Sequence, residues 1–358
     1  MQFSQPRKLF RRIVTALALS LSLILGAALS VAPANGSSEL GSPGPTLVFP
    51  QFAPGQPLHF VAYGDTRFTD PAVEGVTNPR IRKWLAQQIG QQHPQAILLT
   101  GDTPFHGADP RDWEVFQRET ESWRKEKAIQ LPAIGNHEML GGGPAGLANY
   151  SKNFPDIAGH RFYSALLGSV EVISLDFTSP SGASSFQGRW FAAQLDHIPP
   201  RVEFLIILYH LPWVADRQSQ ILAGLPPQEA VALRTLLEAR LPKIHARVLV
   251  FNGHIHNYER FERLGVEYVI TGGGGAKPYP VLYRGGGDLY QDTAFPVYHY
   301  LVVDVADHQL HAVMWKVKDP DAATLEAEAM DRFAITAKRA APSDAVPKRH
   351  SKTQNPPD

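Results

Sequence analysis

The chain has 358 residues, of which 44% are hydrophobic, so it is long enough for one large domain or two modest ones with a sizeable core. It carries 34 basic and 34 acidic residues, and this balance gives no support to nucleic-acid binding. Because the chain contains no cysteine, disulfides, thiolate metal sites and cysteine nucleophiles are excluded.

The N-terminal segment has the layout of an export signal. Basic residues at positions 7–12 precede an uncharged stretch, residues 13–38. We therefore expect residues 1–34 to be a signal peptide and the mature protein to be exported, periplasmic or extracellular. The alternative is an uncleaved membrane anchor, because the apolar part, residues 13–31, is on the border between a signal core and a spanning helix.

Residues 35–57 are rich in proline, glycine and serine and are expected to form a linker, followed by a folded domain at residues 58–318. In chain order, we expect a strand at 58–63, a helix after Asn78, a strand at 96–100, a helix holding Trp113, Phe116 and Trp123, an antiparallel hairpin turning at 168–169, a helix at 188–197, a strand at 204–209, a helix at 228–241 and a strand at 247–251. More strands follow, and residues 319–358 are expected to be a partly disordered extension. This alternation predicts an α/β fold with mixed sheets and helices outside.

Several expected strands end in a turn that carries Asp, Asn or His. The five turns are GDTR (64–67), GDTPF (101–105), GNHE (135–138), HLPW (210–213) and NGHIH (252–256). In open α/β sheets, sites form outside the carboxyl ends of the strands. We therefore expect the five turns to meet at one edge of the sheet.

The residue types in these turns suit metal ions. Asp carboxylates and neutral imidazoles are ligands of Zn, Mn and non-haem Fe, and one carboxylate can bridge two ions. Two neighbouring ions can generate a hydroxide and neutralise a phosphate during transfer. His254 and His256 alone would more often be packing residues. Five turns with the same set of polar residues are hard to explain as core polar groups.

The ordered set of turns resembles the signature of the calcineurin-like metallophosphoesterase superfamily. The extended forms GNHE, HLPW and GHIHNYER resemble most its purple acid phosphatase-like branch, and the resemblance covers about residues 58–315. It implies a four-layer α/β/β/α sandwich of two mixed β-sheets flanked by helices. It also implies a two-metal phosphoesterase with its metal site at the carboxyl ends of the strands.

The resemblance also implies a role for each matching residue. The implied metal ligands are Asp65 and His256 for one ion (M1), Asn136, His210 and His254 for the other (M2), and Asp102 for both. The ions would be divalent or trivalent, namely Fe, Mn or Zn. His137 would hydrogen-bond the phosphate and protonate the leaving oxygen as general acid, so His137 and Asp102 are the expected catalytic residues.

Two positions depart from the family pattern. Arg67 stands where many members have a histidine ligand, and a guanidinium cannot ligate a metal. Phe105 stands where purple acid phosphatases have a tyrosine ligand, and it has no oxygen. M1 would then have three protein ligands plus solvent. We expect Arg67, together with Asn136 and His137, to contact the substrate phosphate, although a structural salt bridge for Arg67 is the alternative.

The expected reaction is metal-dependent hydrolysis of a small phosphorylated substrate, a phosphomonoester first, by in-line attack of a metal-bound hydroxide. One alternative is a phosphodiesterase or nucleotidase with the same centre. Another is a non-catalytic phosphate-binding protein with a degraded M1 site, although a mere binder has no need of His137 as a proton donor. No nucleic-acid scaffold binding is expected, and membrane contact is expected only if the N-terminal segment stays uncleaved.

Overall fold

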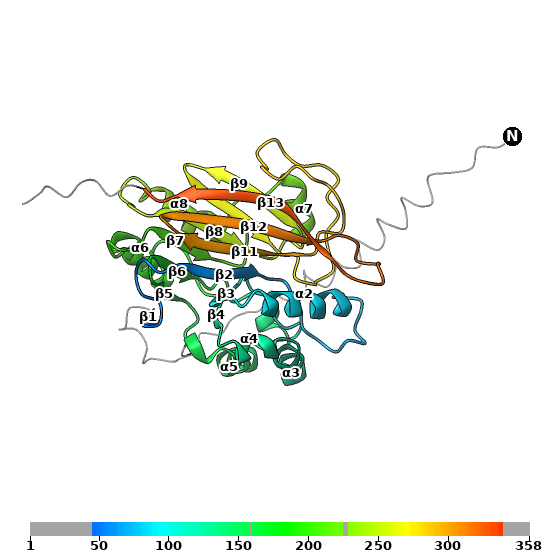
Figure 1. Ribbon diagram of the computed structural model, residues 1–358. Coiled ribbons are helices and arrows are strands. Elements are labelled where there is room, and N and C mark those ends of the chain that lie inside the picture. The colour runs from blue at the N-terminus through cyan, green and yellow to red at the C-terminus, as the bar shows by residue number, and fades with distance from the viewer. Residues whose placement is uncertain (1–44, 158, 225–227, 339–358) are drawn as a thin grey trace, which may run out of the picture. The chain divides into compact units, whose positions relative to one another are not determined.

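The computed structural model describes residues 45–157, 159–224 and 228–338 (Figure 1). All described elements belong to the unit that runs from Pro43 to Asp358. The expected signal peptide or anchor, residues 1–34, lies outside the described residues. Among the helices that are described, none combines the length and apolarity needed to cross a membrane.

The described strands form two mixed sheets. The seven-stranded sheet has the order β1-β5-β6-β7-β8-β10-β9, and the six-stranded sheet has the order β13-β12-β11-β2-β3-β4. The first comprises β1 (Thr46–Val48), β5 (Tyr163–Leu167), β6 (Val170–Ser174), β7 (Phe204–Leu208), β8 (Arg247–Asn252), β10 (Val266–Thr271) and β9 (Tyr258–Arg263). The second comprises β13 (Ala327–Thr336), β12 (Gln309–Val317), β11 (His299–Ala306), β2 (Leu58–Tyr63), β3 (Ala96–Leu99) and β4 (Ile129–Pro132).

Each sheet combines a block of parallel strands with antiparallel strands. In the six-stranded sheet, β2, β3 and β4 are parallel, whereas β11, β12 and β13 are added antiparallel. In the seven-stranded sheet, β6, β7, β8 and β10 are parallel, and β5 and β9 run antiparallel to their neighbours. The β5–β6 pair is the predicted hairpin, turning at residues 168–169.

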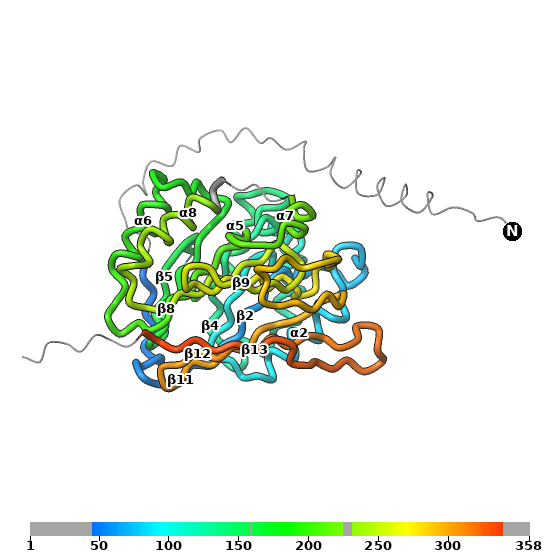
Figure 2. Tube along the Cα trace, turned by 90° about the horizontal axis from the view of Figure 1, so that it is seen from above, coloured from blue at the N-terminus to red at the C-terminus, as the bar shows by residue number. Residues whose placement is uncertain are grey.

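Helices flank both sheets (Figures 1 and 2). Beside the six-stranded sheet lie α2 (Pro79–Gln91), α3 (Pro110–Glu119), α4 (Glu121–Lys125), η1 (His137–Met139), α5 (Gly143–Asn153) and η2 (Pro155–Ile157). Three further helices follow strands of the seven-stranded sheet in the chain. They are α6 (Phe186–Asp196), which follows β6, and α7 (Arg217–Ala223) and α8 (Gln228–Glu238), which follow β7. The pair α6 and α8 pack against each other, as both views show.

Burial along β7 shows why the two sheets stack. Phe204, Ile206 and Leu208 pack in the core that also holds strands of the six-stranded sheet, whereas Leu205 and Ile207 pack in a second core with α6 and α8. Alternate residues of a strand face opposite sides of the sheet, and both sides of β7 are covered. All five side chains are therefore buried. The predicted four-layer sandwich is therefore confirmed.

Local sequence explains the start of α2 and the break between α3 and α4. The Asn78 side chain accepts the backbone N–H of Ile81 at 3.1 Å, and proline follows as the first helical residue. The single helix expected to hold Trp113 and Trp123 is in fact two helices. They are separated by Thr120, which has non-helical backbone angles and whose hydroxyl donates to the Phe116 carbonyl at 2.6 Å.

The sheets extend beyond the expected domain bounds of 58–318. Strand β1 lies in the expected linker and pairs with β5, with Leu47 opposite Ala165. Strand β13 lies in the expected C-terminal extension and pairs with β12 along its whole length. Neither strand has a strong apolar alternation: β1 is three residues long, and only Ile335 of β13 is buried. Pairing with β5 and β12 is therefore the contact that identifies β1 and β13 as strands.

Candidate metal centre

The five polar turns come together between the two sheets. Those after β2, β3 and β4 leave the carboxyl ends of parallel strands of the six-stranded sheet, and those after β7 and β8 leave parallel strands of the seven-stranded sheet. Within each sheet, backbone bonds join neighbouring turns, since Gly253 N–H donates to the His210 carbonyl and Asp65 N–H donates to the Gly101 carbonyl, both at 3.0 Å. Across the sheets, His254 N–H donates to Asp65 Oδ1 at 2.9 Å. The five turns therefore do meet, but between two sheets rather than at one edge of a single sheet as expected.

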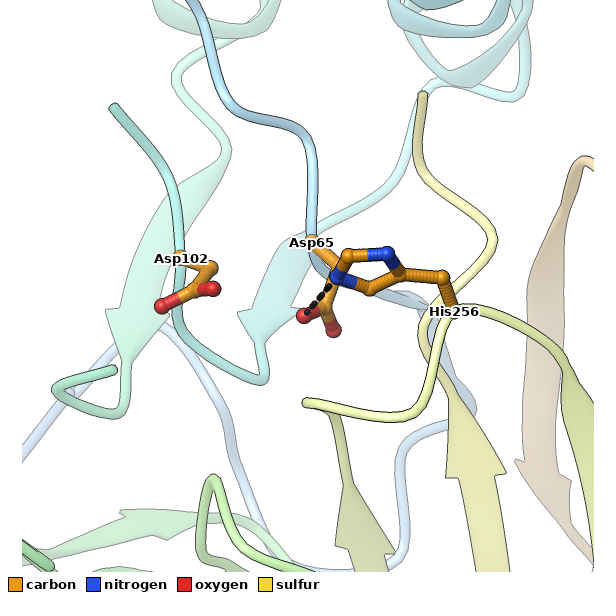
Figure 3. A group of neighbouring side chains, drawn as sticks. All are labelled: Asp65, Asp102 and His256. Carbon is orange, nitrogen blue, oxygen red and sulfur yellow. Dashed lines mark ion pairs between the residues drawn. The ribbon is translucent and has the colours of Figure 1, made fainter. Parts of the chain in front are cut away.

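One group of ligand atoms belongs to Asp65, Asp102 and His256 (Figure 3). Their ligand atoms lie within 4.8 Å of one another, and all three residues are buried. His256 Nε2 lies 3.6 Å from Asp65 Oδ1. His256 Nδ1 donates to the Lys277 carbonyl at 2.7 Å, which leaves the Nε2 lone pair directed toward the carboxylates. Among the described residues, nothing hydrogen-bonds to this buried Nε2. A metal ion fits these donors.

A second group of ligand atoms belongs to Asn136, His210 and His254, next to Asp102. His210 Nε2 lies 3.1 Å from Asn136 Oδ1, 3.3 Å from His254 Nδ1 and 3.3 Å from Asp102 Oδ1. His254 Nδ1 lies 3.2 Å from the same Asn136 oxygen. His210 Nδ1 donates to the Thr100 carbonyl at 2.9 Å, so its Nε2 lone pair faces the other donors. Two nitrogens and two oxygens thus meet, which again suits a cation.

The electrostatics favour bound cations at both groups. Burial and the neighbouring Asp102 carboxylate raise the pKa of Asp65 well above its ordinary value. Burial also raises the pKa of Asp102, but His137, His210 and Arg67 outweigh it, and the net shift is downward. Two adjacent buried carboxylates repel each other unless a cation lies between them. Burial lowers the pKa of His254 to about 3, and the neutral imidazole is the form that binds metal.

His137 lies beside these groups rather than within them. Its Nδ1 donates to the Phe105 carbonyl at 2.6 Å, and its Nε2 lies 3.8 Å from Asp102 Oδ2. Its backbone N–H donates to Asp102 Oδ1 at 2.9 Å. The Phe105 ring lies against the His137 ring, with centroids 5.3 Å apart. His137 is therefore oriented by the backbone of the residue that replaces the family's tyrosine.

Arg67 also reaches the site. Its Nη2 lies 3.5 Å from Asp102 Oδ2, and its buried Nε has no hydrogen-bond partner among the described residues. The ion pair with Asp102 matches the structural alternative for Arg67. A guanidinium has five N–H donors, so donors other than those used for Asp102 are left for a substrate oxygen.

Glu138 is a residue of the site to which sequence reasoning gave no role. One carboxylate oxygen accepts the N–H of Thr103 at 2.7 Å, and the other accepts the N–H groups of Gly135 at 2.7 Å and Asp102 at 3.0 Å. Glu138 thus holds the turns after β3 and β4 together. Burial raises its pKa to about 8. The sequence feature that could have indicated a role for Glu138 is its place in the GNHE turn, directly after Asn136 and His137.

The backbone of the turns is constrained as well as their side chains. Asp65, Arg67, Asp102 and His254 have φ values of 54°, 49°, 55° and 67°, a region that is costly for residues other than glycine. Gly253 is needed for close approach, since a Cβ there would lie 2.4 Å from Asp65 Oδ2. Strained backbone of this kind is concentrated at functional sites because the surrounding structure holds it.

Comparisons with known proteins match this geometry. The family model for calcineurin-like phosphoesterases matches residues 58–258, which is more than half of the chain. The chain therefore belongs to the calcineurin-like phosphoesterase family. Its relatives include purple acid phosphatase 21 of Arabidopsis thaliana, 24% identical over 61% of this chain and 50% of the relative, and purple acid phosphatase 1 of Ipomoea batatas, 26% identical over 57% of this chain and 42% of the relative. These matches confirm the predicted resemblance to the purple acid phosphatase-like branch.

Solved structures share the fold. The purple acid phosphatase PPD1 from yellow lupin (Lupinus luteus) seeds superposes with a TM-score of 0.63 at 19% identity, covering 79% of this chain and 55% of that one. GAP50, the anchor in the inner membrane complex of Plasmodium, superposes with a TM-score of 0.57 at 14% identity, covering 77% of this chain and 89% of that one. The chain spans about half the length of the curated relatives it matches.

Proposed function

We propose that this protein hydrolyses phosphate esters at a two-metal centre and prefers small phosphomonoesters. The observation that carries the proposal is the place of Asp102, which belongs to the group with Asp65 and His256 and lies 3.3 Å from His210 in the second group. A carboxylate shared by two sets of donors is what a bridging ligand requires. Family membership supports the same chemistry.

The proposed ligands follow the two groups of donor atoms. M1 is held by Asp65, His256 and Asp102, and M2 by Asn136, His210, His254 and Asp102. Bound Fe, Mn or Zn ions would supply Lewis-acid charge stabilisation and activate water near neutral pH. Glu138 keeps the Asp102 and Asn136 turns in register, because its carboxylate accepts N–H groups from both sides.

His137 is the proposed proton donor to the leaving oxygen. Its ring is fixed through Nδ1 by the Phe105 carbonyl, so Nε2 is the atom that faces Asp102 and the site. Because Nδ1–H donates to the Phe105 carbonyl, Nε2 carries a proton when the ring is an imidazolium. That proton can hydrogen-bond a phosphate oxygen and then move to the departing oxygen, which leaves a neutral His137. The Arg67 guanidinium, beside Asp102, would bind another oxygen of the same phosphate.

The test is metal analysis of the purified full-length protein, paired with hydrolysis of an aryl phosphate and a bis-aryl phosphate. We expect two ions per chain, hydrolysis that is lost on chelation, and the aryl phosphate as the faster substrate. Preference for the bis-aryl phosphate would instead identify a phosphodiesterase. Metal binding with neither ester hydrolysed would identify a non-catalytic phosphate-binding protein and contradict the proposal.

A further inference from the structure

A sixth turn reaches the candidate metal centre, and the function proposed above assigns no role to it. It follows β6 and has the sequence DFTS, residues 176–179. Because β6 runs parallel to β7, this turn leaves the same edge of the seven-stranded sheet as the turn that carries His210. Leu175 N–H donates to the Leu208 carbonyl at 2.9 Å, so the two turns begin side by side.

Phe177 is the residue of this turn that touches the site. Its ring lies against the ring of His210, with centroids 5.4 Å apart and planes inclined by 36°. It also meets the Tyr209 ring edge-on, with centroids 6.4 Å apart. His210 is fully buried, whereas Phe177 is half-buried. Phe177 therefore covers one side of a proposed M2 ligand.

The backbone that carries Phe177 is fixed by its neighbour Asp176, which is fully buried. The Asp176 carboxylate accepts Arg161 Nε at 2.7 Å, the Thr178 N–H at 2.8 Å and the Ser179 hydroxyl at 2.8 Å. The Gln187 side chain accepts the Asp176 N–H at 2.7 Å and donates to the Asp176 carbonyl at 2.8 Å. A ring held by such a network is preorganised for its contact.

The His210 ring needs a contact of this kind. Its Nδ1 donates to the Thr100 carbonyl, which fixes one atom of the ring. The torsion that turns an imidazole about its Cβ–Cγ bond has broad minima, so packing against the ring has to define its plane. The His254 ring lies beside it at 80°, but His254 is itself a proposed ligand. Phe177 binds no ion and can hold the His210 plane before an ion arrives.

The alternative is that Phe177 serves core packing alone, and Phe162 provides the comparison. Both phenylalanines are half-buried, and both pack against the core that lies under α6 and α8. Phe162 contacts the rings of Phe186 and Trp190, with centroids 5.8 Å and 5.0 Å apart. The two residues thus share burial and core but differ in their contact with His210.

We propose that Phe177 is a positioning residue for the M2 ligand His210. Held by the Asp176 turn, its ring fixes the plane of the imidazole, so that Nε2 faces Asn136 and Asp102. This inference rests on the ligands of the proposed function and deepens it, because it adds a sixth turn to the five that form the centre.

The first experiment records the imidazole N–H signals of the metal-free, full-length protein by NMR after labelling histidine with ¹⁵N. We expect a protected Nδ1–H signal from His210, assigned by its absence in His210→Gln, because this proton is hydrogen-bonded and buried. Phe177→Ala should broaden or abolish the signal. Phe177→Tyr, which keeps the ring, and Phe162→Ala should retain it. Absence of the signal from the wild type, or its persistence in Phe177→Ala, would overturn the inference.

The second experiment is calorimetric titration of the same metal-free proteins with Mn²⁺. In Phe177→Ala we expect M2 affinity about ten-fold weaker and M1 affinity unchanged, as for loss of a contact that orients a ligand. Phe162→Ala should bind at both sites like the wild type. Wild-type M2 affinity in Phe177→Ala would overturn the inference, and so would an equal loss in Phe162→Ala, which would indicate general loosening of the core. A wild type that binds a single ion contradicts the proposed centre, and the N–H signals then decide the role of Phe177.

Discussion

At the scale of single residues, Asp102 should matter more for activity than Asp65. Asp102 contributes to both groups of donors, whereas Asp65 contributes to one. We predict that Asp102→Asn lowers kcat/KM by at least about 100-fold and lowers it more than Asp65→Asn does, because weakening a bridging carboxylate affects both ions. Steady-state hydrolysis of an aryl phosphate by the two variants checks this. Wild-type activity in Asp102→Asn would rule out the two-metal centre.

Replacing His137 should impair turnover without impairing metal binding. Its imidazole Nδ1 contacts the Phe105 carbonyl, and the contact that supports Asp102 comes from its backbone N–H, which alanine retains. We predict that His137→Ala binds metal nearly normally yet turns over about 100-fold or more slowly, with the largest loss for poor leaving groups, which need the proton. Metal content that falls together with activity would show that His137 is a ligand instead.

How far residue-level roles could be read from the sequence depended on the kind of residue. Asp65 and Asp102 follow apolar strands and belong to a small set of ligand types, so their pattern was visible. Glu138 acts through contacts with residues whose proximity only the folded chain creates, such as Thr103. No spacing rule brings such pairs together in advance.

At the scale of elements, the start of β11 supports the glycine-rich turn after β10. His299 N–H donates to the Gly273 carbonyl at 3.0 Å, His299 Nδ1 lies 3.0 Å from the Val297 carbonyl, and Nε2 lies 3.2 Å from the Thr271 hydroxyl. His299 is fully buried, and burial lowers its pKa to about 4. This histidine is therefore neutral in the folded protein above about pH 4.

That burial predicts a pH-dependent stability. Between about pH 6.5 and pH 4 the unfolded chain binds a proton at His299 that the folded chain does not, so the free energy of unfolding falls as the pH is lowered through this window. Across the whole window the free energy of unfolding falls by ~3 kcal/mol, and about 2 kcal/mol of this fall occurs between pH 7 and pH 5. Urea denaturation at both pH values checks this.

The matched comparison is between His299→Gln and His311→Gln, since His311 is exposed on β12. His299→Gln should show a smaller loss of stability between pH 7 and pH 5 than the wild type, and His311→Gln should show the wild-type loss. Identical pH dependence in all three proteins would mean that His299 is not the source.

The sequence predicted the boundaries of helices and strands best where the local hydrophobic pattern is strong. Strands β2, β3, β7 and β8 consist mainly of apolar residues and lie where the sequence predicts them, to within one residue. Strand β13 is half-exposed and obtains its place from nine residues of pairing with β12, a contact that its own sequence does not specify. The break at Thr120 was missed because the apolar spacing continues across it.

At the scale of the whole molecule, the site depends on both sheets. Asp65 and Asp102 follow strands of one sheet, and His210 and His254 follow strands of the other. The α/β class follows from alternating strands and helices, but the pairing order of the thirteen described strands depends on long-range contacts that periodicity cannot supply. The resemblance to a known family supplied the two-sheet arrangement, and the fold agrees with it.

Export is the remaining property of the whole chain, and it rests on residues 1–34, outside the described residues. We predict that host-cell fractionation finds the protein outside the cytoplasm, shortened by about 30 residues, because a basic start and an uncharged stretch direct export and cleavage. A full-length product in the membrane would favour the anchor, and a full-length soluble cytoplasmic product would contradict export.

The two-metal centre is tested most directly by calorimetric titration of the metal-free, full-length protein with Mn²⁺. We predict two binding events, with M1 the weaker, because it has three protein ligands against four for M2. His256→Ala should remove the weaker event and His254→Ala the tighter one. A single event in the wild type, or the same event lost in both variants, would contradict the proposed centre.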